Sequence, residues 1–82
     1  PGLELEQVYQ LITRVGEHLN NECLDVLEAT QIEGLESFDA ENLVIRTVTR
    51  VKPGKHLRIQ RLLRSKLKTA FDQQLAKKIR PG

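Results

Sequence analysis

The first quarter of the chain carries the spacing of an amphipathic helix. Apolar residues recur at steps of three and four, the repeat of one helix face, at Leu5, Val8, Ile12, Val15 and Leu19. Glu4 and Glu6 fall in the first turn, where a carboxylate interacts favourably with the helix dipole. Asn20 and Asn21 tolerate a left-handed backbone, so they mark the expected end. The pattern predicts a helix over residues 5–19.

Two strands follow the helix. Residues 43–51 alternate between two faces, with Leu43, Ile45, Thr47, Thr49 and Val51 on one side and Val44, Arg46, Val48 and Arg50 on the other. Residues 27–35 alternate less regularly, and β-branched Thr30 and Ile32 favour a strand there. The polar connector 36–42 is hairpin-like, and we expect Phe38 to fold back onto the sheet edge. The pattern predicts an antiparallel hairpin.

A second helix is predicted over residues 55–77, because Pro53-Gly54 ends the preceding strand. Its expected buried face is formed by Ile59, Leu62, Leu63, Leu67, Ala70, Phe71 and Leu75. The opposite side carries a basic stripe and candidate anion-binding surface, made of Arg58, Arg61, Arg64 and Lys68. Lys66 lies at the border of the apolar face, so we expect its ammonium group to point outward.

These elements predict an α+β fold in a single domain over residues 1–82, in the order α-β-β-α. The antiparallel β-hairpin would pack on two helices. Since two strands alone are marginally stable in water, the order indicates a truncated ferredoxin-like sandwich that lacks its outer strands. An open strand edge is a template for pairing, so we expect the isolated chain to self-associate through residues 43–51.

Charge is divided between the two halves of the chain. Residues 1–41 hold ten acids and one base, for a net charge of −9, while residues 42–82 hold twelve bases and one acid, for +11. The halves can neutralise each other within one fold, or the acidic half of one copy can meet the basic half of another. Nucleic acid is a third partner for such a basic half.

The sequence gives little support for catalysis, and we expect no enzyme activity, metal or cofactor. The acids are scattered, and neither a Gly-x-Ser-x-Gly motif nor a phosphate-binding loop is present. The one thiol, Cys23, cannot form an internal disulfide, and His18 and His56 are too far apart in sequence for a metal motif. We expect both histidines to be ordinary surface or boundary residues.

Nucleic-acid binding is the less favoured interpretation of the basic helix. Sheet-based RNA readers stack bases on aromatic side chains, but Tyr9, Phe38 and Phe71 are the only aromatic residues and none falls in the second predicted strand. A small basic nucleic-acid-binding or soluble assembly module nevertheless stays as the alternative function.

An ordered series of motifs resembles the C-terminal cytoplasmic domain of small-conductance mechanosensitive (MscS-like) channels. The series comprises the stretches Gln31-Ile32-Glu33-Gly34-Leu35, Leu43-Val44-Ile45-Arg46, Lys52-Pro53-Gly54-Lys55 and Lys68-Thr69-Ala70-Phe71-Asp72. The resemblance covers about residues 26–72, with the preceding helix also in the corresponding place. After Asp72, the segment 73–81 lacks the glycine of that family's final strand.

The resemblance implies a subunit of a homo-oligomeric ring channel gated by membrane tension. This domain would help to wall a vestibule on the cytoplasmic face of the inner membrane, through which permeating ions reach the pore. We therefore expect a fragment of a longer membrane protein, with the transmembrane segments and a middle β domain upstream. The fragment itself has no run of 18 apolar residues and is expected to be soluble.

A basic rim raises the local anion concentration near an opening. The charge split makes four residues candidates for such a role in the vestibule, Arg46, Arg50, Lys52 and Lys55.

Overall fold

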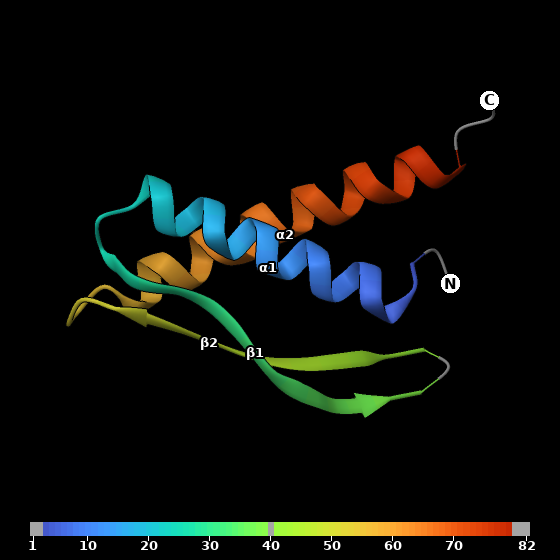
Figure 1. The fold of residues 1–82 in the computed structure, drawn as a ribbon, viewed down its shortest axis with the longest axis horizontal. Coiled ribbons are helices and arrows are strands. Elements are labelled where there is room, and N and C mark those ends of the chain that lie inside the picture. Colours follow the sequence, from blue (N-terminus) through green and yellow to red (C-terminus); the bar gives the residue numbers. More distant parts are fainter. Residues whose placement is uncertain (1–2, 40, 80–82) are drawn as a thin grey trace.

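The computed structural model describes residues 3–39 and 41–79. The elements are α1 (Leu5–Glu22), β1 (Val26–Phe38), β2 (Leu43–Val51) and α2 (His56–Ile79). Within the described residues the sheet consists of β1 and β2, paired antiparallel. Both helices lie on one side of this hairpin (Figure 1). The predicted α+β class and the α-β-β-α order are confirmed.

Helix α1 begins and ends with specific hydrogen bonds. At its start the backbone N–H of Glu4 donates to Oε1 of Gln7 at 3.1 Å. At its end Cys23 adopts an extended backbone, and its N–H donates to the carbonyl oxygen of Leu19 at 3.0 Å. The expected end at Asn20 and Asn21 is wrong, because both lie inside the helix and no non-glycine residue described here has a positive φ.

The pairing of β1 with β2 begins where Val26 lies opposite Val51 and ends where Phe38 lies opposite Leu43. Several shifts in register occur between these two points. Asp39 builds the turn, because its Oδ1 accepts the N–H groups of Glu41 and Asn42 at 2.9 and 2.7 Å. The turn is therefore shorter than predicted, and β1 extends to Phe38. The expectation that Phe38 folds back onto the sheet is wrong, since 68% of it is exposed.

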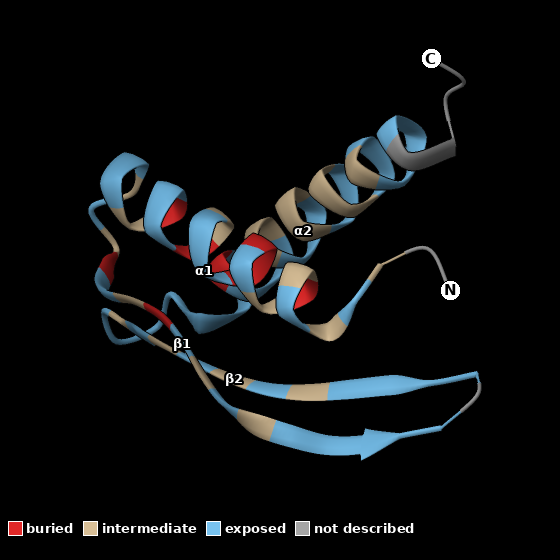
Figure 2. Ribbon diagram, turned by 45° about the vertical axis from the view of Figure 1, so that its right-hand side comes forward, coloured by how far each residue is buried: buried red, intermediate tan, exposed pale blue. Residues whose placement is uncertain are grey.

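The buried core follows the inner face of α1, from Val8, Leu11 and Ile12 to Leu19, and is completed by Val26 and Ile59. Leu19, Val26 and Ile59 form its buried centre, with Val51 and Leu62 packed against them. Figure 2 shows the buried residues on α1, on the facing part of β1 and near the start of α2. The far half of the hairpin is largely exposed, so burial is strongly uneven along the sheet.

The close packing of α1 on β1 requires Gly16. A Cβ at this position would lie 2.6 Å from Cβ and 3.0 Å from Oγ1 of Thr30. Thr30 is itself buried and shares a 2.6 Å hydrogen bond with the hydroxyl of Thr49 on β2. This contact therefore links α1 to both strands.

Helix α2 packs on α1 more than on the sheet. Among its described residues only Ile59 is buried, while Leu62, Leu63, Leu67, Ala70 and Phe71 are half-buried and Leu75 is exposed. The predicted buried face of α2 is therefore only partly buried, because an apolar groove separates its distal part, at Phe71 and Leu75, from Leu43 and Ile45 of β2. In the described part of the chain, neither helix has the length and hydropathy needed to cross a bilayer.

Candidate functional site

The four candidate vestibule residues follow β2 into the turn before α2. Arg46 and Arg50 lie on the exposed face of β2, and each is paired across the hairpin with a carboxylate of β1. Arg46 contacts Glu36, and Nη1 of Arg50 lies 2.9 Å from Oε1 of Glu28. These pairs offset much of the arginine charge locally.

Lys52 and Lys55 occupy the turn itself and are exposed. The backbone N–H of Lys52 donates to the carbonyl oxygen of Asp25 at 2.9 Å, which joins this turn to the α1–β1 turn. Gly54 makes the bend possible, since its φ of +80° lies in the left-handed region. The ion pairs of the described residues include neither lysine ammonium, so these two are the candidates whose charge is not held in a direct ion pair.

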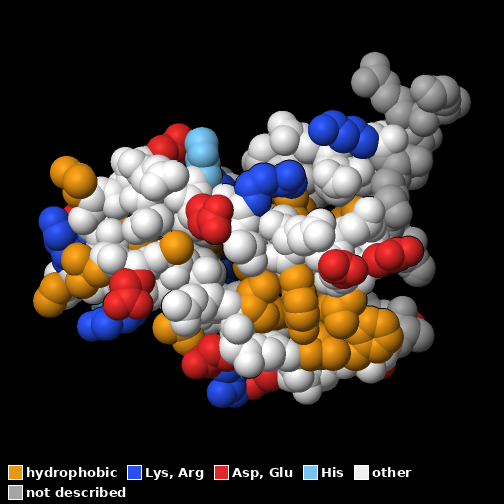
Figure 3. Space-filling view, in the orientation of Figure 1, with side chains coloured by type: hydrophobic (Ala, Val, Ile, Leu, Met, Phe, Trp, Pro, Cys, Tyr) orange, Lys and Arg blue, Asp and Glu red, His pale blue; other side chains and the backbone are white. Residues whose placement is uncertain are grey.

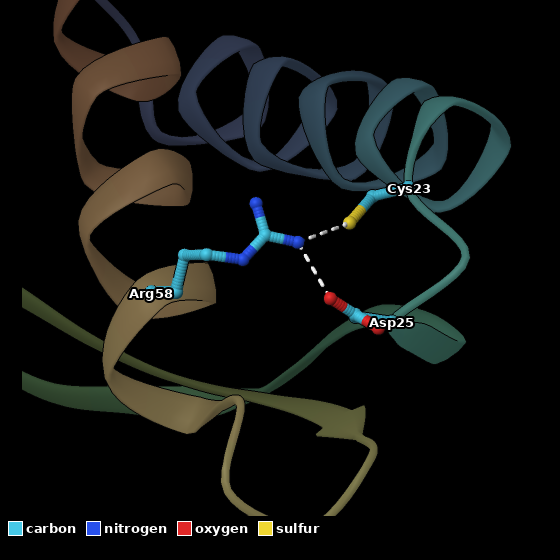
Figure 4. A network of polar contacts seen from close by, with 3 residues as sticks. All are labelled: Cys23, Asp25 and Arg58. Carbon is cyan, nitrogen blue, oxygen red and sulfur yellow. Dashed lines mark hydrogen bonds and ion pairs between the residues drawn. The ribbon is translucent and has the colours of Figure 1, made fainter.

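The candidate anion-binding stripe is divided by the fold. Arg58 turns toward the α1–β1 connection, where its Nη2 donates to Oδ2 of Asp25 at 2.6 Å and to Sγ of Cys23 at 3.5 Å (Figure 4). Lys68 pairs with Asp72 one turn later on α2, at 2.9 Å. Arg61 and Arg64 are exposed. The stripe therefore retains two arginines directed at solvent rather than four cations in a row.

The contact between Arg58 and Asp25 also shifts their proton affinities. The hydrogen bond from Arg58 is the main cause that lowers the pKa of Asp25, and Lys55 and Lys52 add Coulombic attraction. The same hydrogen bond raises the pKa of Arg58. Both groups are thus held in their charged forms, which fastens the start of α2 to the α1–β1 turn.

A second charged contact joins the two helices. Nζ of Lys66 lies 3.1 Å from Oε2 of Glu22, whose other oxygen lies 2.8 Å from Nε2 of His18. The hydrogen bond from Lys66 is the main cause that lowers the pKa of Glu22. A shallow polar groove of about 670 Å³ runs beside this contact, lined by residues that include Arg14, Glu17, Ser65 and Thr69. Its lining contains two cations, Arg14 and Lys66, and one carboxylate, Glu17, and Lys66 is already paired with Glu22.

The ion pairs show where the two oppositely charged halves meet. Four of the six join an acid of residues 1–41 to a base of residues 42–82: Glu36–Arg46, Glu28–Arg50, Asp25–Arg58 and Glu22–Lys66. Within the described residues, pairing inside one chain therefore accounts for much of the charge split that the sequence displays.

An apolar groove lies between α1, β2 and the distal half of α2, and two of its lining residues, Val8 and Ile12, belong to the buried core. It has a volume of about 330 Å³ and is lined by Leu3, Val8, Ile12, Leu43, Ile45, Phe71 and Leu75. In Figure 3 the largest hydrophobic patch on this face spreads at lower right, over the region between α1 and the hairpin. The periodicity of the sequence did not predict this groove. Its signal was the large number of apolar residues on α2, which two strands cannot cover.

The described residues show no arrangement typical of a metal site, since no group of three or more His, Cys, Asp or Glu side chains converges there. Cys23 is half-buried, and His18 and His56 lie on the surface. Comparison of the chain with protein-family models, with curated proteins and with solved structures finds no match. Any functional interpretation therefore rests on the sequence pattern and the geometry of the fold.

Proposed function

We propose that this chain is a structural and assembly domain of a ring-shaped channel similar to the small-conductance mechanosensitive type. In this proposal the domain forms part of the wall of a cytoplasmic vestibule and has no catalytic role or cofactor. The observation that carries the proposal is the uncovered apolar surface between α1, β2 and the distal half of α2. A domain with such a surface gains stability when a neighbouring element covers it.

The arrangement of elements supports the resemblance noted in the sequence. The Gly34-containing segment lies in β1, the segment 43–46 opens β2, and Lys52-Pro53-Gly54-Lys55 makes the turn into α2. Each motif thus occupies the kind of element that the resemblance requires. This agreement supports the proposal at the level of topology, whereas the ring assembly and the gating by membrane tension follow from the resemblance alone.

The sheet edges support an assembly role. In the described residues β1 and β2 pair only with each other, so one edge of each strand is open. The exposed face of β2 alternates valine with arginine, and each arginine is held by a carboxylate of β1. Charged side chains on an edge strand discourage indiscriminate pairing, which suits a domain that meets defined neighbours.

The first experiment tests membrane attachment of the parent protein. An antibody against this domain is used on fractionated cells, and the membranes are washed with alkaline carbonate, which removes peripheral proteins. We expect an antigen in the washed membrane fraction with a mass several times the 9.4 kDa of this chain. A small antigen in the supernatant would refute the channel proposal.

A second experiment tests the electrostatic part of the proposal. Replacing Arg46, Arg50, Lys52 and Lys55 with glutamine in the intact channel should shift its preference toward cations, and added salt should reduce the difference by screening. The pair Arg61→Gln and Arg64→Gln serves as a control, because both residues are exposed on α2. An unchanged anion–cation preference in the fourfold variant would contradict the role of these residues in ion access.

A further inference from the structure

The two ends of the 43 Å long axis carry different surfaces. The turn end is formed by residues 23–25 and 52–57, where α1 meets β1 and β2 meets α2. The hairpin end is formed by the start of α1 and by residues 38, 39 and 41–43 of the hairpin. Figure 1 shows these regions at opposite ends of the ribbon.

The turn end is apolar and positively charged. Leu24 is 88% exposed, and more than half of Leu27 and of Leu57 is also exposed. In Figure 3 hydrophobic and basic side chains lie together at the left-hand end of the molecule. The nearby Asp25 is bound by Arg58, so its carboxylate is already engaged, while Lys52 and Lys55 stay exposed. Leu24 and the neighbouring Lys52 and Lys55 therefore form an exposed surface that another molecule can contact.

The hairpin end is apolar, and its exposed charges are mostly carboxylates, with Lys77 of α2 as a cation close to the groove residue Leu75. The apolar groove opens there, and Leu35 and Phe38 extend its exposed apolar surface along β1. Acidic residues adjoin the groove in sequence, with Glu4 and Glu6 at the start of α1 and Glu41 just before β2. The ion pairs within the described residues involve none of these three carboxylates.

We propose that copies of this domain associate head to tail, with Leu24 of one copy seated in the hairpin-end groove of the next. Lys52 and Lys55 of the first copy then face the acidic rim of the second. The choice of a second copy as occupant rests on charge complementarity, because one chain carries both surfaces with opposite charge. Contacts between like ends would place lysine against lysine or carboxylate against carboxylate, which is unfavourable.

A heterologous contact of this kind repeats from copy to copy, and it closes a ring when the rotation between copies allows it. The head-to-tail contact deepens the proposed assembly function. Closure of a ring rests on that proposed function, but the contact itself is testable on the isolated chain. The head-to-tail contact also differs from pairing through the open edge of β2, since edge pairing involves neither the turn end nor the charges of Lys52 and Lys55.

Charge reversal provides the first test. Sedimentation equilibrium is measured for the parent chain, for Lys52→Glu with Lys55→Glu, and for Glu6→Lys with Glu41→Lys. Each double variant should weaken self-association at least about tenfold, and an equimolar mixture of the two should restore it. Arg14→Glu with Arg64→Glu is the matched control, because it changes the net charge as much as the first variant at exposed positions between the two ends. This control should associate like the parent chain.

Cross-linking provides the second test and fixes the direction of the contact. In a Cys23→Ser background, one variant carries Leu24→Cys and another carries Leu75→Cys, a position at the groove. Oxidation of the mixture should give a heterodimer, whereas neither variant alone should give a disulfide-linked dimer. Circular dichroism spectra and melting curves establish that each variant remains folded.

Several outcomes would overturn the head-to-tail contact. A strictly monomeric parent chain at about 1 mM would do so, since even a contact of millimolar Kd would be populated there. Cross-links between two copies of the Leu24→Cys variant would indicate a symmetric contact instead. Association that persists in both charge-reversed variants would assign the interface to the open edge of β2. A soluble parent antigen, by contrast, would refute the channel proposal and leave this contact standing.

Discussion

Replacing Gly16 with alanine tests the packing of α1 on β1. The added methyl group would lie 2.6 Å from Cβ of Thr30, whereas two carbon atoms prefer a separation of about 3.5–4.0 Å. The third nearest atom is the backbone nitrogen of Thr30, at 3.3 Å, so rotation of the Thr30 side chain cannot relieve the contact. Helix α1 and strand β1 must therefore move apart by about 1 Å.

Two opposing effects set the size of the change. Alanine is favoured over glycine within a helix by about 1 kcal/mol, which stabilises the variant. Forcing a methyl group into a close contact costs about 1–3 kcal/mol. Moving Thr30 also strains its buried hydrogen bond to Thr49, and an unsatisfied buried hydroxyl group costs about 1–3 kcal/mol. We expect Gly16→Ala to lower the free energy of unfolding by about 1–3 kcal/mol, a large part of the roughly 4–12 kcal/mol typical for a domain of this size.

Urea denaturation followed by circular dichroism measures this change, with helix propensity tested separately by Glu17→Ala at the adjacent exposed position. A double-mutant cycle with Thr30→Gly isolates the contact, because the second substitution removes the atom that clashes. We expect the two losses to be less than additive. A Gly16→Ala variant as stable as the parent chain, or more stable by the propensity gain of about 1 kcal/mol, would refute the close packing of these two residues.

The remaining predictions concern the core, the turn before α2 and the charged contact at the start of α2. Leu19→Ala should lower the free energy of unfolding by about 2–5 kcal/mol because Leu19 is fully buried, whereas exposed Leu24→Ala should change it by less than about 0.5 kcal/mol in urea denaturation. Gly54→Ala should cost about 1–2 kcal/mol through the positive φ alone, because its Cβ would meet no atom within 4 Å, and a smaller loss is expected for Gly54→Asn. Because its folded pKa is lowered, Asp25 stabilises the fold above its ordinary pKa of 3.8 and loses this effect as the pH falls through the folded value. The melting temperature of Asp25→Asn should therefore lie below that of the parent chain near neutral pH and approach it in acid, and a difference independent of pH would contradict this assignment.

Periodicity was sufficient to predict the type and order of the elements. The repeat from Leu5 to Leu19 and the alternation from Leu43 to Val51 each have one strong period, and both lie within the observed α1 and β2. The ends were harder to predict, because they depend on single hydrogen bonds. Cys23 closes α1 beyond the two asparagines, and Asp39 shortens the connector by accepting two backbone N–H groups.

The charged contacts could be predicted only in part. The opposite charges of the two halves indicated that pairing within the chain was one option, but the sequence could not select the partners. Arg58 was assigned to an exposed stripe from its helical position, yet the turn after α1 brings Asp25 within 2.6 Å of its guanidinium group. Such a contact depends on tertiary placement across more than thirty positions of the chain, which no local pattern encodes.

The uneven burial of the fold links its stability to the proposed assembly role. Leu19, Val26 and Ile59 place part of the core beside the two turns, and the ion pair of Asp25 with Arg58 fastens the same end. The hairpin end has the apolar groove beside the buried Val8 and Ile12, but most hairpin residues there, Phe38 among them, are exposed, so the local stability of the hairpin draws on fewer buried contacts. Covering exposed apolar surface stabilises a domain more than covering surface that is already buried. A partner that binds only the folded form raises the stability of the domain by mass action. Association at the hairpin end would therefore cover the exposed half of the hairpin, the least buried part of the sheet.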